Sequence, residues 1–299
     1  MSGAADDRTA GKEVLELDEQ RPACEADLAA LKEIWLSSFS EDTPADVEAF
    51  FEGGFSPQQA MVYTVNGQPV SMLFLLAVPL SLPGEKPLSA GYVYAAATLP
   101  AWRGRGIFSS LLQAAHKMAA SRGMQAVFLR PAEPSLQAFY QRFGYRPGFF
   151  AGTVTLTRQQ VEQAAAPASG TGGRRYAMPT FFRENWLRQN GFAYPAWDRD
   201  FWRYAVNCAG GEYWEAPHWA ALCQPSASHM LVRDLLCRDE HLPDFYRHLC
   251  RHYRFSSCTL RRPVLEGTGQ VFGMVCPLSG DADRLFFDCP RRYMGPALD

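Results

Sequence analysis

The sequence lacks several features that would narrow its function at once. Its hydrophobic runs are broken well short of membrane-spanning length, and its N-terminus has no basic segment followed by an apolar run. We therefore expect no membrane association, no signal peptide and a cytoplasmic location. The formal net charge of −2 over 299 residues gives no reason to expect a nucleic-acid partner. A chain of this length suggests two domains.

Metal-binding and disulfide patterns are also scarce. The chain has eight cysteines but no Cys-x-x-Cys, and most of the cysteines lie in apolar, strand-like runs, so we expect buried free thiols. His248 and His252 are four residues apart on an expected helix, with Cys250 between them. Two histidines on one helical face can begin a zinc site, but no further ligands follow at short spacing. We expect a solvated helix face and no metal.

The most informative segment is a short turn rich in arginine and glycine. A strand-like run ends at Thr98, and the turn containing Arg103, Gly104, Arg105 and Gly106 opens directly into an amphipathic helix. The first turn of a helix has unpaired backbone N–H groups and the positive end of the helix dipole. Glycines let the backbone approach a ligand, and arginines bind phosphate oxygens. The segment predicts a pyrophosphate cradle at a helix N-terminus.

Two common phosphate-binding loops are excluded by residue type. A P-loop needs Lys-Ser or Lys-Thr after its last glycine, where Ile107 and Phe108 stand here. A dinucleotide fingerprint needs a third spaced glycine and an acid about twenty residues later. Taken alone, the segment is equally consistent with a solvated basic turn that caps a helix.

A second motif follows about thirty residues later. Residues 126–130 form an expected strand, Pro131 to Pro134 interrupt it, and Ser135 is the expected N-cap of a helix that contains Phe139 and Tyr140. Gly144 fits the C-cap. Together the two motifs resemble the GNAT (Gcn5-related) N-acetyltransferases, which combine an Arg/Gln-x-x-Gly-x-Gly/Ala loop with a later Phe-Tyr-x-x-x-Gly-Phe/Tyr helix end. The loop departs from the family at Phe108, which replaces a small residue. The resemblance covers about residues 24–157.

The resemblance implies a fold of the α/β class, with a mixed sheet as in the GNAT acyl-CoA N-acyltransferases. The first half agrees with it: two amphipathic helices within 28–51, a hairpin over 61–78 with an Asn66-Gly67 turn, a strand over 88–98, and a helix to about residue 121. We expect a catalytic, acetyl-CoA-binding domain at residues 24–160. A linker rich in alanine and glycine is expected at 161–175.

The remainder, residues 176–299, is expected to form a second domain. Its predicted order of hairpin strands, helix and strands repeats that of the first half, but residues 238–243 contain no glycine and begin the helix with two acids. It therefore resembles a degenerate GNAT-like domain that has lost the phosphate loop. Tandem domains of this kind are similar to the enhanced-intracellular-survival group of acetyltransferases, on the segments 200–202, 231–236 and 293–299. An unrelated α+β packing or dimerisation domain is the alternative.

The resemblance assigns roles at the expected active site. Acetyl-CoA, as co-substrate, would be bound by residues Ala97, Thr98, Leu99, Arg103, Gly104, Arg105, Gly106, Ile107 and Phe108. A backbone N–H near Ala97, Thr98 or Leu99 would meet the thioester oxygen. Tyr140 occupies the family position of the proton donor to the leaving thiolate, with a packed aromatic as its alternative role.

The base and the acceptor are less defined. In the tandem group the C-terminal carboxylate collects the proton of the amine, which would make Asp299 the base. A tail that only packs is the alternative, and Glu133 is a second candidate. The acceptor is expected to be a small-molecule or peptide amine. Glu41, Asp42, Asp46 and Glu48 would suit a cationic acceptor, although a solvated helix face explains them as well.

Three function classes follow from these residues. The first is an acetyl-CoA-dependent N-acetyltransferase. The second is a regulatory protein that binds acyl-CoA without turnover, which the unusual Phe108 permits. The third is an adaptor that uses an arginine and aromatic face at Arg247, Arg251 and Arg254, which the near-neutral charge disfavours. A homo-oligomer is left open.

Overall fold

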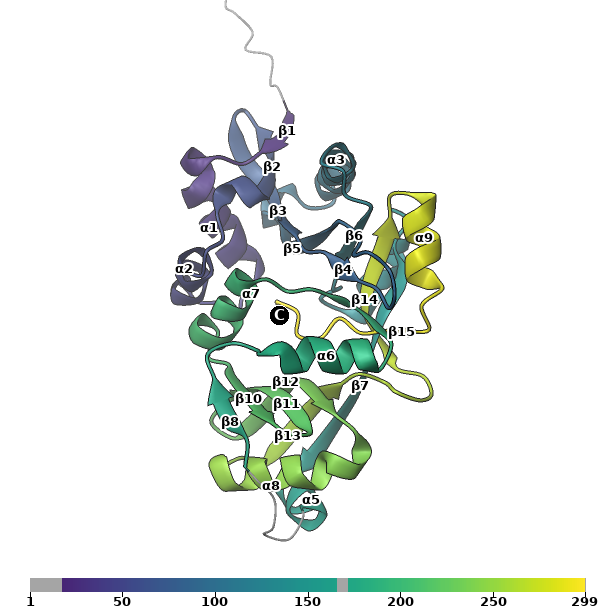
Figure 1. The fold of residues 1–299 in the computed structure, drawn as a ribbon. Helices are drawn as coiled ribbons and strands as arrows, with labels where there is room; N and C mark the ends of the chain where they lie inside the picture. Colours follow the sequence, from purple (N-terminus) through teal and green to yellow (C-terminus); the bar gives the residue numbers. More distant parts are fainter. Residues whose placement is uncertain (1–17, 166–171, 299) are drawn as a thin grey trace, which may run out of the picture.

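The structure is a computed structural model that describes residues 18–165 and 172–298 (Figure 1). A single large mixed sheet runs through it, from the purple and blue strands to the green ones in Figure 1. In spatial order its strands are β1 (Glu19–Pro22), β2 (Ala60–Val65), β3 (Gln68–Ala77), β5 (Ala90–Thr98), β6 (Ala126–Leu129), β14 (Gln270–Pro277), β7 (Arg146–Thr157), β13 (Ser257–Arg262), β12 (His229–Cys237), β11 (Trp219–Pro225), β10 (Glu212–Ala216) and β8 (Arg174–Tyr176). A small sheet contains β15 (Arg291–Arg292), β9 (Phe192–Pro195) and β4 (Leu80–Ser81).

Helices cover the large sheet. Their bounds are α1 (Leu28–Ser38), α2 (Pro44–Glu52), α3 (Ile107–Ser121), α4 (Gln137–Gln141), α5 (Arg158–Ala164), α6 (Phe181–Gln189), α7 (Arg199–Arg203), α8 (Leu242–His252) and α9 (Gly280–Phe287). In the first half, α1 packs against β3 and β5. Helix α3 packs against the same two strands through a separate apolar cluster, the α3-side core, which includes Leu111, Leu112 and Tyr140. None of the helices within the described ranges is long and apolar enough to cross a membrane.

The first half follows its local sequence signals. The hairpin turn has positive φ at both Asn66 (51°) and Gly67 (75°), which is the geometry that the Asn-Gly pair favours. The helix expected after the cradle ends at Ser121, as predicted. Ser135, however, is not a helix N-cap: it lies inside a 3-10 turn, and its hydroxyl donates to the Glu133 carboxylate at 3.1 Å. The turn begins at Pro134 with Glu133 as its N-cap, two residues earlier than expected.

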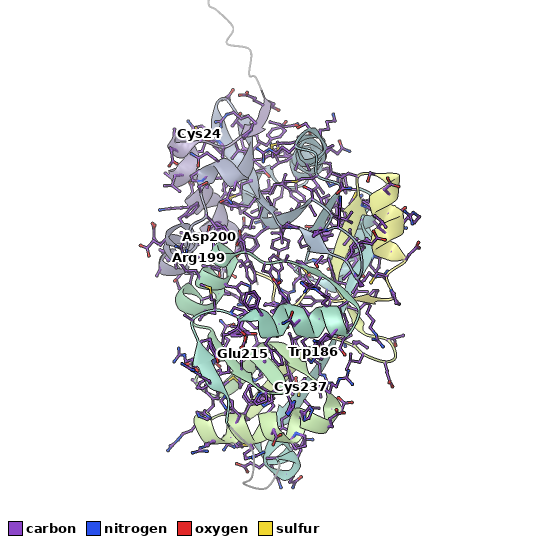
Figure 2. The ribbon with its side chains drawn as sticks, in the orientation of Figure 1. Cys24, Trp186, Arg199, Asp200, Glu215 and Cys237 are labelled. Atoms are coloured by element: carbon purple, nitrogen blue, oxygen red, sulfur yellow. The ribbon has the colours of Figure 1, made fainter. Side chains whose placement is uncertain are left out.

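Two long strands join the halves. Strand β7 pairs along its first part with β14 and along its last part with β13. Strand β14, near the end of the chain, lies between β6 and β7 of the first half and is antiparallel to both. The sheet therefore continues across the division expected near residue 161, and side chains fill the space between the halves (Figure 2). That residues 24–160 and 176–299 form two separate domains therefore stays a prediction.

The expected linker contains ordered elements at both ends. Residues 161–164 belong to α5, where Val161 is fully buried against α8 in the second half. Residues 174 and 175 belong to β8. The glycine- and alanine-rich positions 166–171 lie outside the described residues.

The second half repeats the order of the first. Strands β10, β11 and β12 are antiparallel neighbours, α8 follows β12, and β13 then pairs parallel to β12. In the first half, β2, β3 and β5 are antiparallel, α3 follows β5, and β6 pairs parallel to β5. The turn before α8 holds Asp239 and Glu240 in its first positions and no glycine. This arrangement agrees with a GNAT-like half that lacks the phosphate loop.

The last described segment, residues 293–298, returns to the centre of the molecule (Figure 1). It ends between α6, α7 and the strands of the first half, where the C-terminal label lies in the figure. Tyr293, Met294, Ala297 and Leu298 are all buried. A buried segment of this kind contributes to the core that both halves share.

Candidate functional site

The expected cradle begins α3. Gly104 and Gly106 have φ of 76° and 77°, a left-handed conformation that favours glycine. A Cβ added to either residue would meet no protein atom within 4 Å, so the space beside this backbone is open. Gly106 is the N-cap of α3, and the first backbone bond into the helix runs from the Ser110 amide to the Gly106 carbonyl at 3.0 Å. The amides of residues 107–109 precede that bond and are available to an anion.

Two arginines flank these glycines. The Nε atom of Arg103 donates to the Thr98 carbonyl at 2.9 Å, which ties the loop to the end of β5. The guanidinium of Arg105 lies 4.7 Å from the centre of the Trp102 ring. Both arginines are exposed, and the first turn of α3 carries no acid. The electrostatics at this helix N-terminus therefore favour an anion.

Strand β5 opens away from β6 beside the cradle. The parallel pairing of the two strands ends at Val93 and Leu129. Farther along, β5 carries a bulge: two residues, Ala95 and Ala96, stand opposite one residue of β3. Ala95 has a φ of 45°, which is unusual for a residue other than glycine. The bulge and the end of the pairing leave backbone groups of β5 without a strand partner on the β6 side.

The register decides which amides face this gap. The Leu99 amide donates to the Val70 carbonyl of β3 at 2.9 Å, so it is not available as the donor to a thioester oxygen. In an antiparallel ladder, amides point alternately toward and away from the partner strand. The Ala97 amide therefore also points toward β3, and the Thr98 amide points toward β6. Of the three amides expected from the sequence, the geometry leaves that of Thr98.

A pocket of about 240 Å³ joins the cradle to α4. Its lining residues are Thr98, Trp102, Arg103, Gly104, Gly106, Ile107, Phe108, Ser109 and Phe139. The Phe108 ring, which departs from the family pattern, stacks on Phe139 with 5.8 Å between ring centres. Ile107 also packs against Val65 and Val70 in a small apolar cluster. A hollow of about 330 Å³ lies elsewhere, at Phe150 and Arg292, and includes none of the expected site residues.

Tyr140 follows Phe139 on α4 and is buried. Its ring lies 5.6 Å from that of Tyr145, in an edge-to-face contact. Burial raises the pKa of Tyr140 to about 12, so the phenol keeps its proton at neutral pH. Its hydroxyl has no hydrogen-bond partner within residues 18–165 and 172–298. The neighbouring Tyr145 hydroxyl is 2.9 Å from His116 Nε2.

The two candidates for the base differ in position. Asp299 lies outside the described residues, but Leu298 before it is buried, and its carbonyl accepts a hydrogen bond from the Tyr92 hydroxyl of β5 at 3.4 Å. Glu133 is exposed and accepts from Ser135. The described end of the chain thus reaches the strand that carries the bulge.

The acids expected near the acceptor mostly serve the local structure. Asp46 closes a capping box with Thr43 at the start of α2, and Glu48 pairs with Lys32 at 2.5 Å. Asp42 accepts from the Trp35 indole at 2.7 Å. These contacts support the interpretation of Asp46 and Glu48 as a solvated helix face.

The histidines of α8 lie away from this site. His248 is buried beside Trp214 and Trp219, and its ring stacks on His252 at 4.2 Å. No group of three or more metal-ligating side chains gathers anywhere in the described ranges. The structure describes the side chains of seven cysteines, and each of these seven is free.

Sequence reasoning missed several parts of the site. Phe139 and Trp102 line the pocket, although only Tyr140 was expected from the Phe-Tyr pair. The Phe-Tyr pair could have indicated this, because neighbouring helix residues point in different directions: here Phe139 lines the pocket and Tyr140 is buried in the core. The bulge at Ala95 carried no signal, since three consecutive alanines fit a regular strand equally well.

Comparison with known proteins agrees with this geometry. The acetyltransferase (GNAT) domain family matches residues 19–148. The chain is 29% identical over 134 residues to N-acetyltransferase Eis of Mycobacterium tuberculosis (strain CDC 1551 / Oshkosh), a match that covers 42% of this chain and 33% of that protein. The chain thus spans about a third of the length of the curated relatives that it matches.

Solved structures are similar over most of the chain. A GCN5-related N-acetyltransferase from Kribbella flavida matches with a TM-score of 0.68 and 14% identity, covering 86% of this chain and 71% of that one. Eis1 from Mycobacterium abscessus matches with a TM-score of 0.64 and 17% identity, covering 88% and 75%. At these identities the likeness shows the fold, and it extends through both halves.

Proposed function

Because residues 19–148 match the acetyltransferase (GNAT) domain family, we propose that the chain is an N-acetyltransferase. It would move an acetyl group from acetyl-CoA to a primary amine of a small molecule or peptide. The observation that carries the proposal is the pocket in which the left-handed glycines, the start of α3 and the gap beside β5 converge.

The residues present fit the diphosphate of coenzyme A. The free amides at the start of α3 and the two exposed arginines supply donors and positive charge, and no Cβ at Gly104 or Gly106 obstructs the backbone. Phe108 does not block this fit, because its ring is turned toward Phe139 and its amide remains at the helix N-terminus. The gap between β5 and β6 would hold the acyl end.

The reaction requires one proton to leave the amine and one to reach the sulfur. The amine nitrogen bonds to the thioester carbonyl carbon, and the carbon–sulfur bond breaks. The Thr98 amide would donate to the carbonyl oxygen as negative charge develops there. Tyr140 would donate its proton to the departing thiolate, a role for which its raised pKa keeps it protonated.

Asp299 is the proposed base. An alkyl ammonium has a pKa of about 10, so a group must collect its proton before attack. The burial of Leu298 and its contact with Tyr92 support a carboxylate of Asp299 in this role. The exposure of Glu133 makes it the weaker candidate.

The first experiment is calorimetric titration of acetyl-CoA into the wild type and into the double variant Arg103→Glu/Arg105→Glu. Micromolar binding that weakens by at least about tenfold in the variant supports the cradle, since two exposed cations become anions beside the diphosphate. A matched double reversal at Arg251→Glu/Arg254→Glu, on exposed arginines of the second half, should leave binding unchanged. An amine screen then follows coenzyme A release by chromatography, which avoids thiol reagents in a chain with free cysteines.

The results separate the alternatives. Binding with turnover of any amine supports the transferase. Binding without turnover across the screen favours a regulatory acyl-CoA-binding protein. Failure of the wild type to bind acetyl-CoA contradicts both, and leaves the adaptor, whose polyanion retention would depend on Arg251 and Arg254.

A further inference from the structure

The second half contains a bulge in the strand that corresponds to β5. Strand β12 pairs with β11 from Trp219 opposite Cys237 to Leu222 opposite Asp234, and the register then shifts so that Cys223 stands opposite Val232. Arg233 is the extra residue. The parallel pairing of β12 with β13 ends at Val232, just before it.

This geometry repeats that of the proposed acyl site. In the first half, pairing with the following parallel strand ends at Val93, and the bulge at Ala95 and Ala96 comes next. Both strands precede the helix of their half, α3 or α8. The bulge is therefore kept in the half that has no phosphate loop.

The bulge of β12 turns two charged side chains toward the centre. In a regular strand, side chains alternate between the two faces, so one of the residues 233 and 234 would point to the α8 face. Here Val232 and Leu235 both pack on the α8 face of the sheet. Because of the extra residue, Arg233 and Asp234 both lie on the face away from α8. There Arg233 donates to the Ala297 carbonyl, and Asp234 accepts from Arg183 at 2.9 Å.

The segment that these residues hold runs from Tyr293 to Leu298. The Tyr293 hydroxyl donates to Asp234 at 2.8 Å, and the Trp197 indole donates to the Met294 carbonyl at 3.1 Å. At its far end the Leu298 carbonyl accepts from Tyr92 of β5. The segment thus bridges the bulged strand of the second half and the bulged strand of the first.

Arg233 is well suited to fix the end of this bridge. Its exposed fraction is only 3%, and a guanidinium so deeply buried is stable only with oxygen acceptors or negative charge around it. Its charge also reaches Tyr94 of β5, where it opposes the rise in pKa that burial causes. In the sequence, Asp299 follows directly after Leu298, the last residue of this segment that the structure describes.

We propose that the β12 bulge is a clamp in which Arg233 holds residues 293–298 beside β5, and so fixes the segment that precedes the proposed base, Asp299. The clamp rests on the proposed function for the role of Asp299. It explains why a half without a phosphate loop keeps the strand irregularity of the acyl site: the irregularity now orients a polypeptide segment instead of a thioester. Arg233 is a positioning residue, because it acts through the segment.

The test compares Arg233→Gln and Arg233→Lys with the wild type in the full chain. Three quantities are measured: kcat with the best amine of the screen, KM for acetyl-CoA, and the rate at which a carboxypeptidase releases aspartate and leucine. Arg158→Gln is the control, because Arg158 also donates to main-chain carbonyls, those of Tyr253 and Cys250, but far from the segment.

For Arg233→Gln we expect kcat to fall at least about tenfold, KM for acetyl-CoA to change less than about twofold, and carboxypeptidase release to rise at least about tenfold. Arg233→Lys should recover part of both losses, and Arg158→Gln should match the wild type. Wild-type kcat and release in Arg233→Gln would overturn the clamp.

Two further outcomes keep the test decisive. If Arg233→Gln does not fold, Arg233→Lys is judged by the same readouts: faster release together with lower kcat supports the clamp, and wild-type values for both overturn it. If the wild type shows no acetyl transfer, the proposed function fails, whereas the release rates still test the clamp without any catalysis.

Discussion

Replacing Tyr140 by phenylalanine isolates the step that the proposed mechanism assigns to this residue. The ring is buried among aromatic side chains of the α3-side core, and the substitution keeps that packing while removing a single hydroxyl. Burial raises the pKa of Tyr140 to about 12, so at neutral pH the change removes a proton donor and not a phenolate. General acid catalysis typically contributes 10²–10⁴-fold, equivalent to about 2.7–5.4 kcal/mol of activation free energy.

We therefore expect kcat of Tyr140→Phe to fall about 10²–10⁴-fold, with little change in the affinity for acetyl-CoA. The stability should stay within about 0.5 kcal/mol of the wild type, since the lost hydroxyl has no hydrogen-bond partner in the described parts of the chain. The assay is coenzyme A release at saturating amine, with binding measured by calorimetry and stability by urea unfolding.

Tyr145→Phe is the matched control. Tyr145 is also buried, but its hydroxyl bonds to His116 at 2.9 Å, so its loss should lower the free energy of unfolding by about 1–3 kcal/mol and leave kcat near the wild-type value. The assignment of Tyr140 would be refuted by a Tyr140→Phe enzyme within about threefold of wild-type kcat, or by an equal loss in Tyr145→Phe.

Three other predictions follow from single contacts. Gly106→Ala and Gly67→Ala replace glycines with φ of 77° and 75° in open space, so each variant should lose about 1–2 kcal/mol of stability in urea unfolding. Only Gly106→Ala should weaken acetyl-CoA binding. Equal affinities of the two variants would contradict the cradle. Burial lowers the pKa of His248 from 6.5 to about 3, so between these pH values the unfolded chain binds a proton that the folded chain does not. Stability should therefore fall by up to about 1.4 kcal/mol per pH unit from pH 6.5 toward 3. The free energies of unfolding at pH 7 and pH 5 should differ less in His248→Leu than in the wild type, and an unchanged difference would contradict this role. Arg183→Met leaves Asp234 buried without its cation and should cost about 3–5 kcal/mol, part of which Arg183→Met/Asp234→Leu should restore; a double variant less stable than the single one would argue against the pair.

The first half could be predicted closely because its signals are local. The Asn66-Gly67 pair selects the hairpin turn, and the glycines of the cradle select left-handed backbone directly before a helix. The Phe-Tyr helix end lies a short distance along the chain, so the pocket that joins Phe108 to Phe139 forms between neighbouring elements. The fold class and the conformation of the turn before α3 therefore followed from residue type, spacing and the family resemblance, whereas phosphate binding by that turn stays a prediction.

The sequence narrowed the proposed oxyanion donor only to three neighbouring amides. The sequence indicated the end of β5, but the choice among three successive amides depends on which of them faces β3. That choice follows from the Leu99–Val70 hydrogen bond and from the bulge in β5, which a run of alanines does not predict. A shift of one residue exchanges the two faces of a strand, so register must come from the partner strand.

Strand neighbours across the two halves were likewise beyond the sequence. The apolar run of residues 272–277 predicted a strand but not its neighbours. In the structure, β14 inserts between β6 and β7 and forms backbone hydrogen bonds with both. Buried strands read alike wherever they pair, since both faces are covered in every position.

The sequence by itself thus determined most of the elements, the glycine-containing turn before α3 and the repeated strand–helix–strand order, all of which depend on residues close together in the chain. Only the tertiary structure decided that the sheet is continuous and that residues 293–298 connect β12 with β5. It alone placed Arg233 on the central face, next to Ala297. These features depend on contacts between residues far apart in the chain, where loop closure, register and burial are settled together and no local pattern records the outcome.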